Sequence, residues 1–438
     1  MPASPAAHDI FDARPFRHRP VPRTRSRADR QPIAPPCVPR RAPSACTARA
    51  TDAGLPVAVV FAVRCFGILF DAFRRTTTLE THMKHTFWIG CAAAAGAMTC
   101  SVAFAQSSVT LYGNLDAALL YTNKTLDATT GRNAGHQFAM TDTGMTPTTF
   151  GMMGTEDLGG GLKAKFQLES GFAVTNGAFN HSNGNFFGRQ AWVGLDGAFG
   201  TVKAGLQYSP FLLAIFDSDP RSFSHFGSGL IPYVDNVLVT GLFNANAVSY
   251  TSPTIAGLTG SAMFAFGGAA GNFQAGRQYS ASLKYEHGGF MINAAFYDGN
   301  DGGTAATPVP STVAFVGRTI GAAYRFGPVT AKASFASYKV GGSFSNNVYG
   351  GGLDYQATPA VDLNGGVWYT SDRNDTANHS LLAALGASYN LSKATSLYAQ
   401  VAMVDNHGAM NTGLGINNAL YGATGTTVGA NVGIRHAF

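Results

Sequence analysis

The chain has 438 residues, of which 30 are basic and 24 acidic, so its formal net charge is +6. Hydrophobic residues make up 45% of it and charged residues only 12%, about half the charged fraction of an ordinary soluble domain. The apolar content excludes an intrinsically disordered chain. The 53 glycines follow no three-residue period, which excludes a collagen-like chain.

The basic excess is confined to the first part of the chain. Residues 1–105 carry 14 basic and six acidic residues together with all five cysteines, whereas 106–438 carry 16 basic and 18 acidic residues. Residues 1–82 are rich in Arg, Pro and Ala and show no sustained apolar period. We interpret 1–82 as a disordered or mis-annotated extension; the alternative is a basic tail that binds nucleic acid. We expect no nucleic-acid partner for the working protein.

Residues 83–105 have the three parts of a secretory signal peptide. A basic start at Lys84 is followed by an apolar core and then by small residues. We therefore expect Met83 to be the functional start and 106–438 to be the mature protein. That part contains no cysteine, as suits an exported protein that does not depend on disulfides.

After the signal peptide, apolar and polar residues alternate in segments of about ten residues. The pattern is strict in 162–169 and 329–335 and returns in 427–438. No run of 18 apolar residues occurs beyond residue 106, so the sequence predicts no transmembrane helix there. A period of two is typical of strands with one apolar and one polar face.

The connections between these segments alternate between tight turns and longer polar loops. About sixteen segments can be counted. Short turns at one end, long loops at the other and an even strand number are typical of outer-membrane barrels. We predict an all-β fold, a 16-stranded antiparallel transmembrane barrel wide enough to hold an aqueous channel. The tight turns are expected at Leu158–Gly160, Gly197–Gly200, Thr254–Gly257, His287–Gly289, Gly327–Pro328, Thr358–Ala360 and Leu391–Ala394.

Six stretches of 106–438 carry the motifs of one known family. They are SSVTLYGNLDAALLY at 107–121, GTEDLGGGLKAKFQLESGF at 154–172, GRQAWVGLDGAFGTVKAGLQY at 188–208, VSYTSP at 248–253, YNLSKATSLY at 389–398 and the terminal GIRHAF. In this order they resemble the general trimeric porins of beta-proteobacteria, the Burkholderia and Neisseria type. The resemblance implies a homotrimer in the outer membrane of a Gram-negative bacterium that passes ions and small hydrophilic solutes passively.

The resemblance also implies that the third long loop folds into the lumen and narrows it. The corresponding segment is about Ser209–Asn244, the longest connection, which carries Asp217, Asp219, Arg221 and Asp235. The outer surface is expected to contact membrane lipid and lipopolysaccharide, and the terminal Phe438 to serve membrane insertion. No cofactor, metal site or catalytic residue is implied.

Strand parity nominates the charged residues of the lumen wall. Lys163, Lys165 and Glu169 share the polar face of one strand, Lys203 lies on the polar face of another, and Asp116 lies on that of the first. Because a charge facing lipid at the membrane midplane costs about 2–4 kcal/mol, most strand charges are expected to point inward.

Members of the family usually set arginines on the wall that faces the inward loop and tend to prefer anions. Arg189 in the GRQA motif is retained, whereas Thr149 and Phe243 stand where two other arginines are common. The parity of Arg189 is that of outward residues, so only a bulge or loop-end position brings it to the pore; a subunit contact is the alternative. We predict weak ion selectivity, because the basic and acidic side chains of the expected constriction nearly balance in charge. The bases are Lys163, Lys165, Arg189 and Lys203, and the acids are Asp217, Asp219 and Asp235.

Two alternative functions remain open. A substrate-specific channel would line its path with aromatics, and the inward loop offers Phe211, Phe216, Phe223, Phe226 and Tyr233. An outer-membrane enzyme would need a Ser/His or Asp/His cluster. The histidines of 106–438 are instead scattered over loops and turns without metal-ligand spacing.

Overall fold

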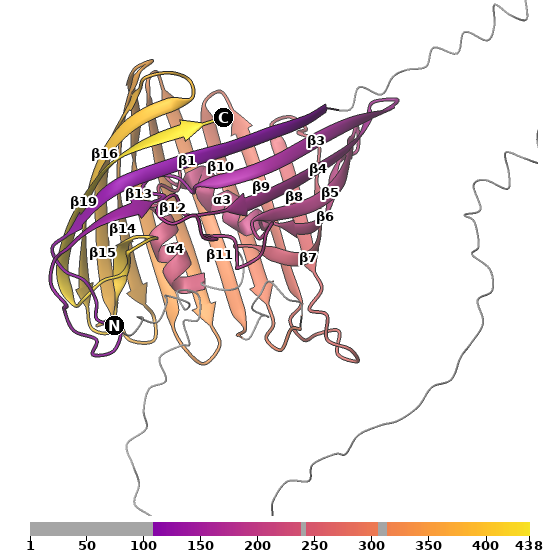
Figure 1. The fold of residues 1–438 in the computed structure, drawn as a ribbon. Helices are drawn as coiled ribbons and strands as arrows, with labels where there is room; N and C mark the ends of the chain where they lie inside the picture. Colours follow the sequence, from indigo (N-terminus) through magenta and orange to yellow (C-terminus); the bar gives the residue numbers. More distant parts are fainter. Residues whose placement is uncertain (1–107, 238–241, 305–312) are drawn as a thin grey trace, which may run out of the picture. The chain divides into compact units, whose positions relative to one another are not determined.

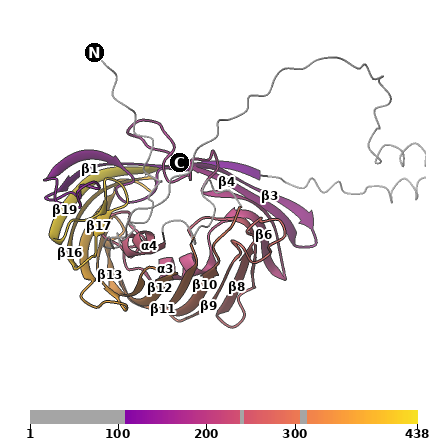
Figure 2. The same cartoon turned by 90° about the horizontal axis from the view of Figure 1, so that it is seen from below.

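A computed structural model describes residues 108–237, 242–304 and 313–438 of the chain. The described strands form an antiparallel sheet that closes on itself into a barrel (Figures 1 and 2). No helix within these ranges is long and apolar enough to span a membrane. The extension expected at 1–82 and the signal peptide expected at 83–105 lie outside the described residues.

Seventeen strands make up the wall, and they fill sixteen positions around it. Strand β2 pairs with the second half of β1 and β3 with the first half, so these two strands share one position. The expected 16-stranded antiparallel barrel is therefore confirmed. The wall strands are β1 (Ser108–Thr122), β2 (Gln137–Asp142), β3 (Thr149–Gly159), β4 (Leu162–Gly171), β5 (Gln190–Gly197), β6 (Gly200–Gln207), β7 (Asn244–Thr251), β8 (Leu258–Ala265), β9 (Gln278–His287), β10 (Phe290–Gly299), β11 (Phe315–Phe326), β12 (Val329–Val340), β13 (Ser345–Thr358), β14 (Val361–Asp372), β15 (His379–Asn390), β16 (Thr395–His407) and β19 (Gly425–Ala437).

The seam of the barrel lies between its first and last strands. Strand β19 pairs antiparallel with β1, from Asn114 opposite Ala437 to Thr122 opposite Gly429. Beyond this ladder, Gly113 and Phe438 exchange two backbone hydrogen bonds of 3.0 and 3.1 Å. The C-terminal residue is therefore part of the wall.

The alternation of side chains explains why the strands close into a barrel. Large apolar residues such as Leu385, 65% exposed, and Val193, 61% exposed, lie on the outside. Polar residues of the opposite parity, such as Asn431 and Thr370, are buried on the inside. All seven expected tight turns coincide with short connections between wall strands. Glycines with positive φ, such as Gly327 at 61°, allow several of these turns.

The inward loop begins directly after β6 and is held against the far wall. It contains α3 (Pro210–Ser218) and α4 (Leu230–Val237), which lie inside the barrel (Figure 2). The Ser209 side chain accepts a hydrogen bond from the Leu212 N–H and so caps α3, and Pro210 occupies the first turn. Helix α3 then packs against β9–β12, where the Asn293 side chain donates to the Ala214 carbonyl at 2.8 Å.

A second inward element was not expected from the sequence. Strands β17 (Thr412–Gly415) and β18 (Ala419–Tyr421), between β16 and β19, form a small hairpin that contacts α4. Every residue of β17 is buried. The hairpin therefore packs as part of the lumen filling, unlike a solvated surface loop.

Candidate constriction site

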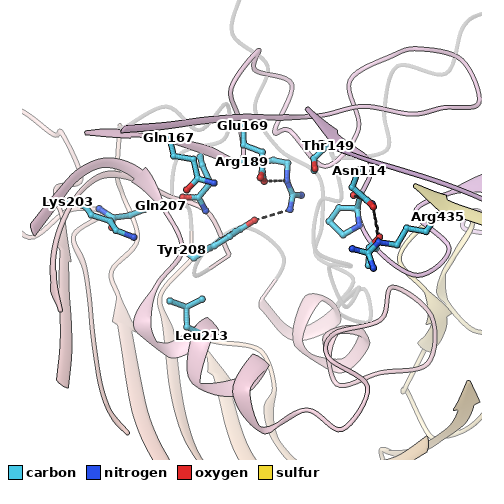
Figure 3. Close-up of a pocket in the computed structure, with 13 residues that line it drawn as sticks. Asn114, Thr149, Gln167, Glu169, Arg189, Lys203, Gln207, Tyr208, Leu213 and Arg435 are labelled. Carbon is cyan, nitrogen blue, oxygen red and sulfur yellow. Dashed lines mark hydrogen bonds and ion pairs between the residues drawn. The ribbon is translucent and has the colours of Figure 1, made fainter. Parts of the chain in front are cut away.

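A cavity of about 380 Å³ lies in the lumen between α3 and the wall formed by β1, β3–β6 and β19 (Figure 3). Leu213, 48% exposed, projects into it from α3. The opposite wall is polar. Its charged and amide side chains are Arg189, Lys203, Arg435, Glu169, Asn114, Gln167, Gln190 and Gln207.

Arg189 reaches this cavity from a loop end. It directly precedes β5, and its N–H donates to the Glu169 carbonyl at 3.2 Å, although Gln190 is already the ladder partner of Glu169. Two successive residues therefore oppose one, as in a bulge, and the parity of β5 does not extend to Arg189. Arg189 therefore faces the lumen from a position at the end of a loop, which is one of the two arrangements expected from its parity.

The positive charge of Arg189 is matched by a carboxylate. Its Nε lies 2.7 Å from Glu169 Oε1, and both residues are largely buried. Its Nη2 donates to the Tyr208 hydroxyl at 2.9 Å, and its Nη1 to the His181 carbonyl at 3.3 Å. The guanidinium also lies 5.5 Å from the ring of Phe243. Arg189 is thus fixed in place and largely neutralised.

Glu169 joins Arg189 to the neighbouring strands. Its Oε2 accepts a hydrogen bond from the Tyr112 hydroxyl at 2.9 Å, and that hydroxyl accepts one from Gln167 at 2.7 Å. The network links β1, β4 and the start of β5. Both oxygens of the carboxylate are therefore engaged, which holds Glu169 on the lumen wall, where parity placed it.

The three lysines of the expected basic wall differ in their surroundings. Lys165 forms an ion pair with Asp196 at 2.6 Å. Lys163 is exposed, lies next to the turn between β3 and β4, and is not among the cavity residues. Lys203 lines the cavity with its ammonium 4.4 Å from the Trp192 ring centroid. No carboxylate of the described residues lies within 4.0 Å of Lys203.

Of the three expected loop acids, Asp217 and Asp235 are partly exposed and Asp219 is buried. Asp217 is one-third exposed on α3 and pairs with Lys284 at 3.4 Å. Asp219 is 2% exposed and accepts hydrogen bonds from the backbone N–H groups of Phe223 at 2.7 Å and Gly229 at 2.9 Å. Burial raises the pKa of the Asp219 carboxyl. Asp219 therefore organises the loop and is not presented to a passing ion.

Arg221 and Asp235 also hold the loop to its surroundings. Arg221 is 4% exposed; its Nε donates to Asn364 of β14 at 2.9 Å and its Nη2 donates to Gln400 of β16. Asp235 on α4 accepts a hydrogen bond from the Thr412 hydroxyl at 3.3 Å, and burial raises its pKa to about 7. Neither side chain is among the cavity residues.

Asp116 on the lumen wall binds a neighbouring backbone segment through its carboxylate. It is fully buried, and its carboxylate accepts hydrogen bonds from the N–H groups of Gly144, Met145 and Thr146, at 3.1, 3.1 and 2.7 Å. The Tyr398 hydroxyl donates to the same carboxylate. These contacts hold the segment that separates β2 from β3, so Asp116 shapes the wall beside the cavity.

One cavity base was not nominated from the sequence. Arg435 of β19 lines the cavity, and its Nε donates to the Asn114 side chain at 2.8 Å. Among the described residues no carboxylate lies within 4.0 Å of it. The inward parity of Arg435 on the last strand could have predicted its place on the lumen wall. The cavity therefore retains two bases without a carboxylate partner, Lys203 and Arg435.

Most aromatics of the inward loop do not line a path. Phe211, Phe226 and Tyr233 are at most 1% exposed, and Phe211 and Tyr233 pack with Tyr297 and Tyr338 of the wall. Phe216 is the loop aromatic that is substantially exposed, at 43%. The aromatic residues therefore anchor the loop to the far wall.

Comparison with known proteins shows that the chain is similar in sequence to outer-membrane porins. A family model described as Gram-negative porin matches residues 92–409. Outer membrane porin protein 32 of Delftia acidovorans is 30% identical over 363 residues, which cover 77% of this chain and 95% of that protein. Major outer membrane protein P.IB of Neisseria lactamica is 28% identical, covering 76% of this chain and 95% of its own length.

Solved structures resemble the barrel as well. The anion-selective porin from Comamonas acidovorans has a TM-score of 0.66 and 26% identity, covering 76% of this chain and all of that one. The trimer form of OmpT from Vibrio cholerae has a TM-score of 0.56 and 14% identity, over 76% of this chain and 99% of that chain. At that identity the second similarity concerns the fold alone.

Proposed function

Because the chain belongs to the Gram-negative porin family, we propose that its lumen is a general diffusion pore with a modest preference for anions. The chain is an outer-membrane channel of a Gram-negative bacterium, and we propose that it has no enzyme activity. Lys203 and Arg435 carry the proposal on selectivity, because they line the cavity without a carboxylate partner among the described residues. Charges inside a narrow constriction act on ions with little screening.

The preference is proposed to be modest because the other charges near the constriction are paired. Arg189 is matched by Glu169, Lys165 by Asp196 and Asp217 by Lys284. The weak selectivity predicted from the sequence thus stays a prediction, but with a different origin. The cancellation lies within local pairs, and the loop acids Asp219 and Asp235 take little part in it.

The burial of Phe211, Phe226 and Tyr233 favours the general pore over a substrate-specific channel. A slide for sugar rings needs several exposed aromatic faces in succession, and the described part of the inward loop offers mainly Phe216. We also propose a homotrimer that contacts membrane lipid and lipopolysaccharide. The support for the trimer is the family itself and the trimer form of a protein with the same fold.

The test is a reversal potential across a planar bilayer in a KCl gradient. An unpaired charge a few Å from an ion is worth on the order of 1 kcal/mol in a water-like medium, so we expect a chloride to potassium permeability ratio of about 5. The K203Q/R435Q variant should bring this ratio toward about 1. The K393Q control removes a base from the turn between β15 and β16, outside the cavity, and should not change it.

Two results would contradict the proposal on selectivity: a wild-type pore that prefers potassium, or a double variant with an unchanged ratio. The same recording tests the oligomer, because a trimer of independent pores closes in three equal steps. Saturation of the solute flux by one sugar in liposome swelling would favour a substrate-specific channel instead.

A further inference from the structure

Two basic residues of the wall strands face outward. On the described strands, the other bases have inward parity: Lys163, Lys165, Lys203, Lys284, Arg325, Lys332 and Arg435. Arg318 on β11 is exposed, and it shares its face with Ile320, 50% exposed, and Tyr324, 51% exposed. Lys339 on β12 is exposed next to Tyr338, which is buried on the lumen side. Both bases therefore project from the outer surface of the barrel.

These two bases are diagonal neighbours on adjacent strands. Arg318 lies opposite Ser337, and Lys339 lies opposite Val316, which sets the two residues about 7–8 Å apart. Their strand ends belong to the long-loop end of the barrel. The outer surface of β11 and β12 therefore carries two neighbouring positive charges near the long-loop end of the barrel.

Two aromatic residues and a third base extend this surface. The Arg318 guanidinium lies 5.5 Å from the Phe296 ring centroid, and Phe296 is its ladder partner on β10. Arg277, directly before β9, lies 5.5 Å from the ring of Tyr279. We call Arg277, Arg318, Lys339, Tyr279 and Phe296 the outer basic surface. Aromatic residues of this kind mark the boundary between hydrocarbon and head groups.

The three bases lack a protein counter-charge. In the ranges that the structure describes, no carboxylate lies within 4.0 Å of Arg277, Arg318 or Lys339. Asp298 is the one acid on the same face of β10, and it forms no ion pair either. The surface therefore keeps a net positive charge.

The position of Arg318 along β11 sets its depth in the membrane. It lies eight residues from Phe326 at the short-turn end, about 27 Å along the strand. With a strand tilt of 35–45°, this is about 20 Å of an apolar band about 25 Å tall. Arg318 is therefore near the upper boundary, where an outward charge is much less costly than at the membrane midplane, and an anionic partner would offset the remaining cost.

We propose that the outer basic surface binds the phosphate groups of an anionic glycolipid in the outer leaflet of the outer membrane. Arg318 is prepared for this role, because its Nη1 donates to the carbonyls of Tyr297 at 3.0 Å and Gly317 at 2.7 Å. The guanidinium is thereby held along the wall, and the side chain stays exposed on the outer surface. Guanidinium groups bind phosphate oxygens with a matched geometry, and an exposed lysine adds a point charge.

This inference deepens the proposed contact with lipopolysaccharide and is independent of the ion preference of the pore. The experiment titrates the detergent-solubilised protein with lipid A that carries two phosphates and with dephosphorylated lipid A, and counts bound lipid by native mass spectrometry. The wild type should bind the phosphorylated form at least about tenfold more tightly. Each base at an anionic lipid surface is worth about fivefold, so R277Q/R318Q/K339Q should weaken binding about 100-fold.

The matched control removes three bases from the same end of the barrel but away from this surface, as K124Q/R132Q/R373Q. It should stay within about twofold of the wild type. Equal wild-type affinity for the two lipids, or equal affinity of the triple variant and its control, overturns the proposal. If the triple variant yields too little folded protein, R318Q alone should weaken binding about fivefold. An unchanged reversal potential in these variants keeps this result separate from the test of the pore.

Discussion

Glu169 determines how much of the charge of Arg189 a passing ion experiences. The pair is 2.7 Å apart and buried, with Tyr112 and Tyr208 completing the hydrogen bonds of the two partners. Removing one partner of a buried pair leaves the other charge uncompensated. The charge of Arg189 is therefore neutralised by a single carboxylate, that of Glu169. The ion selectivity of the pore is expected to depend on that carboxylate.

We predict that E169Q shifts the pore toward anions. The glutamine can still accept a hydrogen bond from Arg189, so the side chains stay in place while one negative charge is lost. The chloride to potassium permeability ratio should rise about fivefold, as measured by the reversal potential. E286Q is the control, since Glu286 lies near the short-turn end beside Lys284. A ratio that is the same in both variants would show that Arg189 does not act on the ion path.

At the residue scale, parity predicted which side chains face inward but not which charges are paired. Lys165 and Lys203 have the same inward parity, yet only Lys165 meets a carboxylate, because Asp196 of β5 comes within 2.6 Å of it. That contact depends on the register between strands and on side-chain direction. Asp219 is a second example, because its partners are backbone N–H groups of its own loop. A pattern of residue types cannot predict such contacts.

The inward loop is held by two different elements. Helix α3 packs on the far wall through Phe211 and its aromatic neighbours. The second half of the loop instead pairs with β17, where the Gly227 N–H donates to the Leu414 carbonyl at 2.8 Å. The hydrogen bond from Thr412 to Asp235 adds α4 to this junction. The α4 end of the loop therefore depends on the hairpin, and α3 does not.

We predict that the junction of α4 and β17 loosens as the pH rises. Burial raises the pKa of Asp235 to about 7, whereas an exposed Asp titrates near 4. The partly buried carboxyl thus favours its neutral form, so the junction is most stable below about pH 4 and loses stability until about pH 7. Single-channel noise should accordingly be greater at pH 8 than at pH 5 in the wild type.

The D235N variant should remove this pH dependence and remain quiet at pH 8, because the amide stays neutral and can still accept the hydrogen bond from Thr412. D127N is the control, since Asp127 lies in the exposed loop after β1, where backbone hydrogen bonds lower its pKa. Equal pH dependence of the noise in the wild type and D235N would contradict the role of Asp235.

At the element scale, the period of two predicted the wall strands and their short turns. The same pattern did not predict that β2 and β3 share one position. The segment between them is held by Asp116, whose carboxylate accepts hydrogen bonds from the three successive N–H groups of Gly144–Thr146. It also did not reveal the β17–β18 hairpin, because four buried residues are too few to show a period.

For the whole molecule, the decisive contact is the seam between β1 and β19. Strand number and closure followed from the count of alternating segments, and the inward loop followed from the family resemblance. The packing at the seam could not be predicted, because it depends on how the side chains of the first and last wall strands meet. A Cβ on Gly113 would collide with the ring of Phe438 and lie 2.7 Å from the Thr149 carbonyl oxygen. Glycine is thus required where the last residue closes the ring.

We predict that G113A lowers the stability of the folded barrel by about 1–3 kcal/mol, the usual cost of overpacking. The temperature at which folded protein converts to its unfolded mobility on a gel measures this. G351A is the control, since the nearest atom to a Cβ on Gly351 is 3.4 Å away. In the F438A background the added methyl group should cost less, because the ring is gone and only the clash with Thr149 remains. An equal cost in both backgrounds would mean that the ring of Phe438 does not pack on Gly113, and that these two residues are joined by their backbone hydrogen bonds alone.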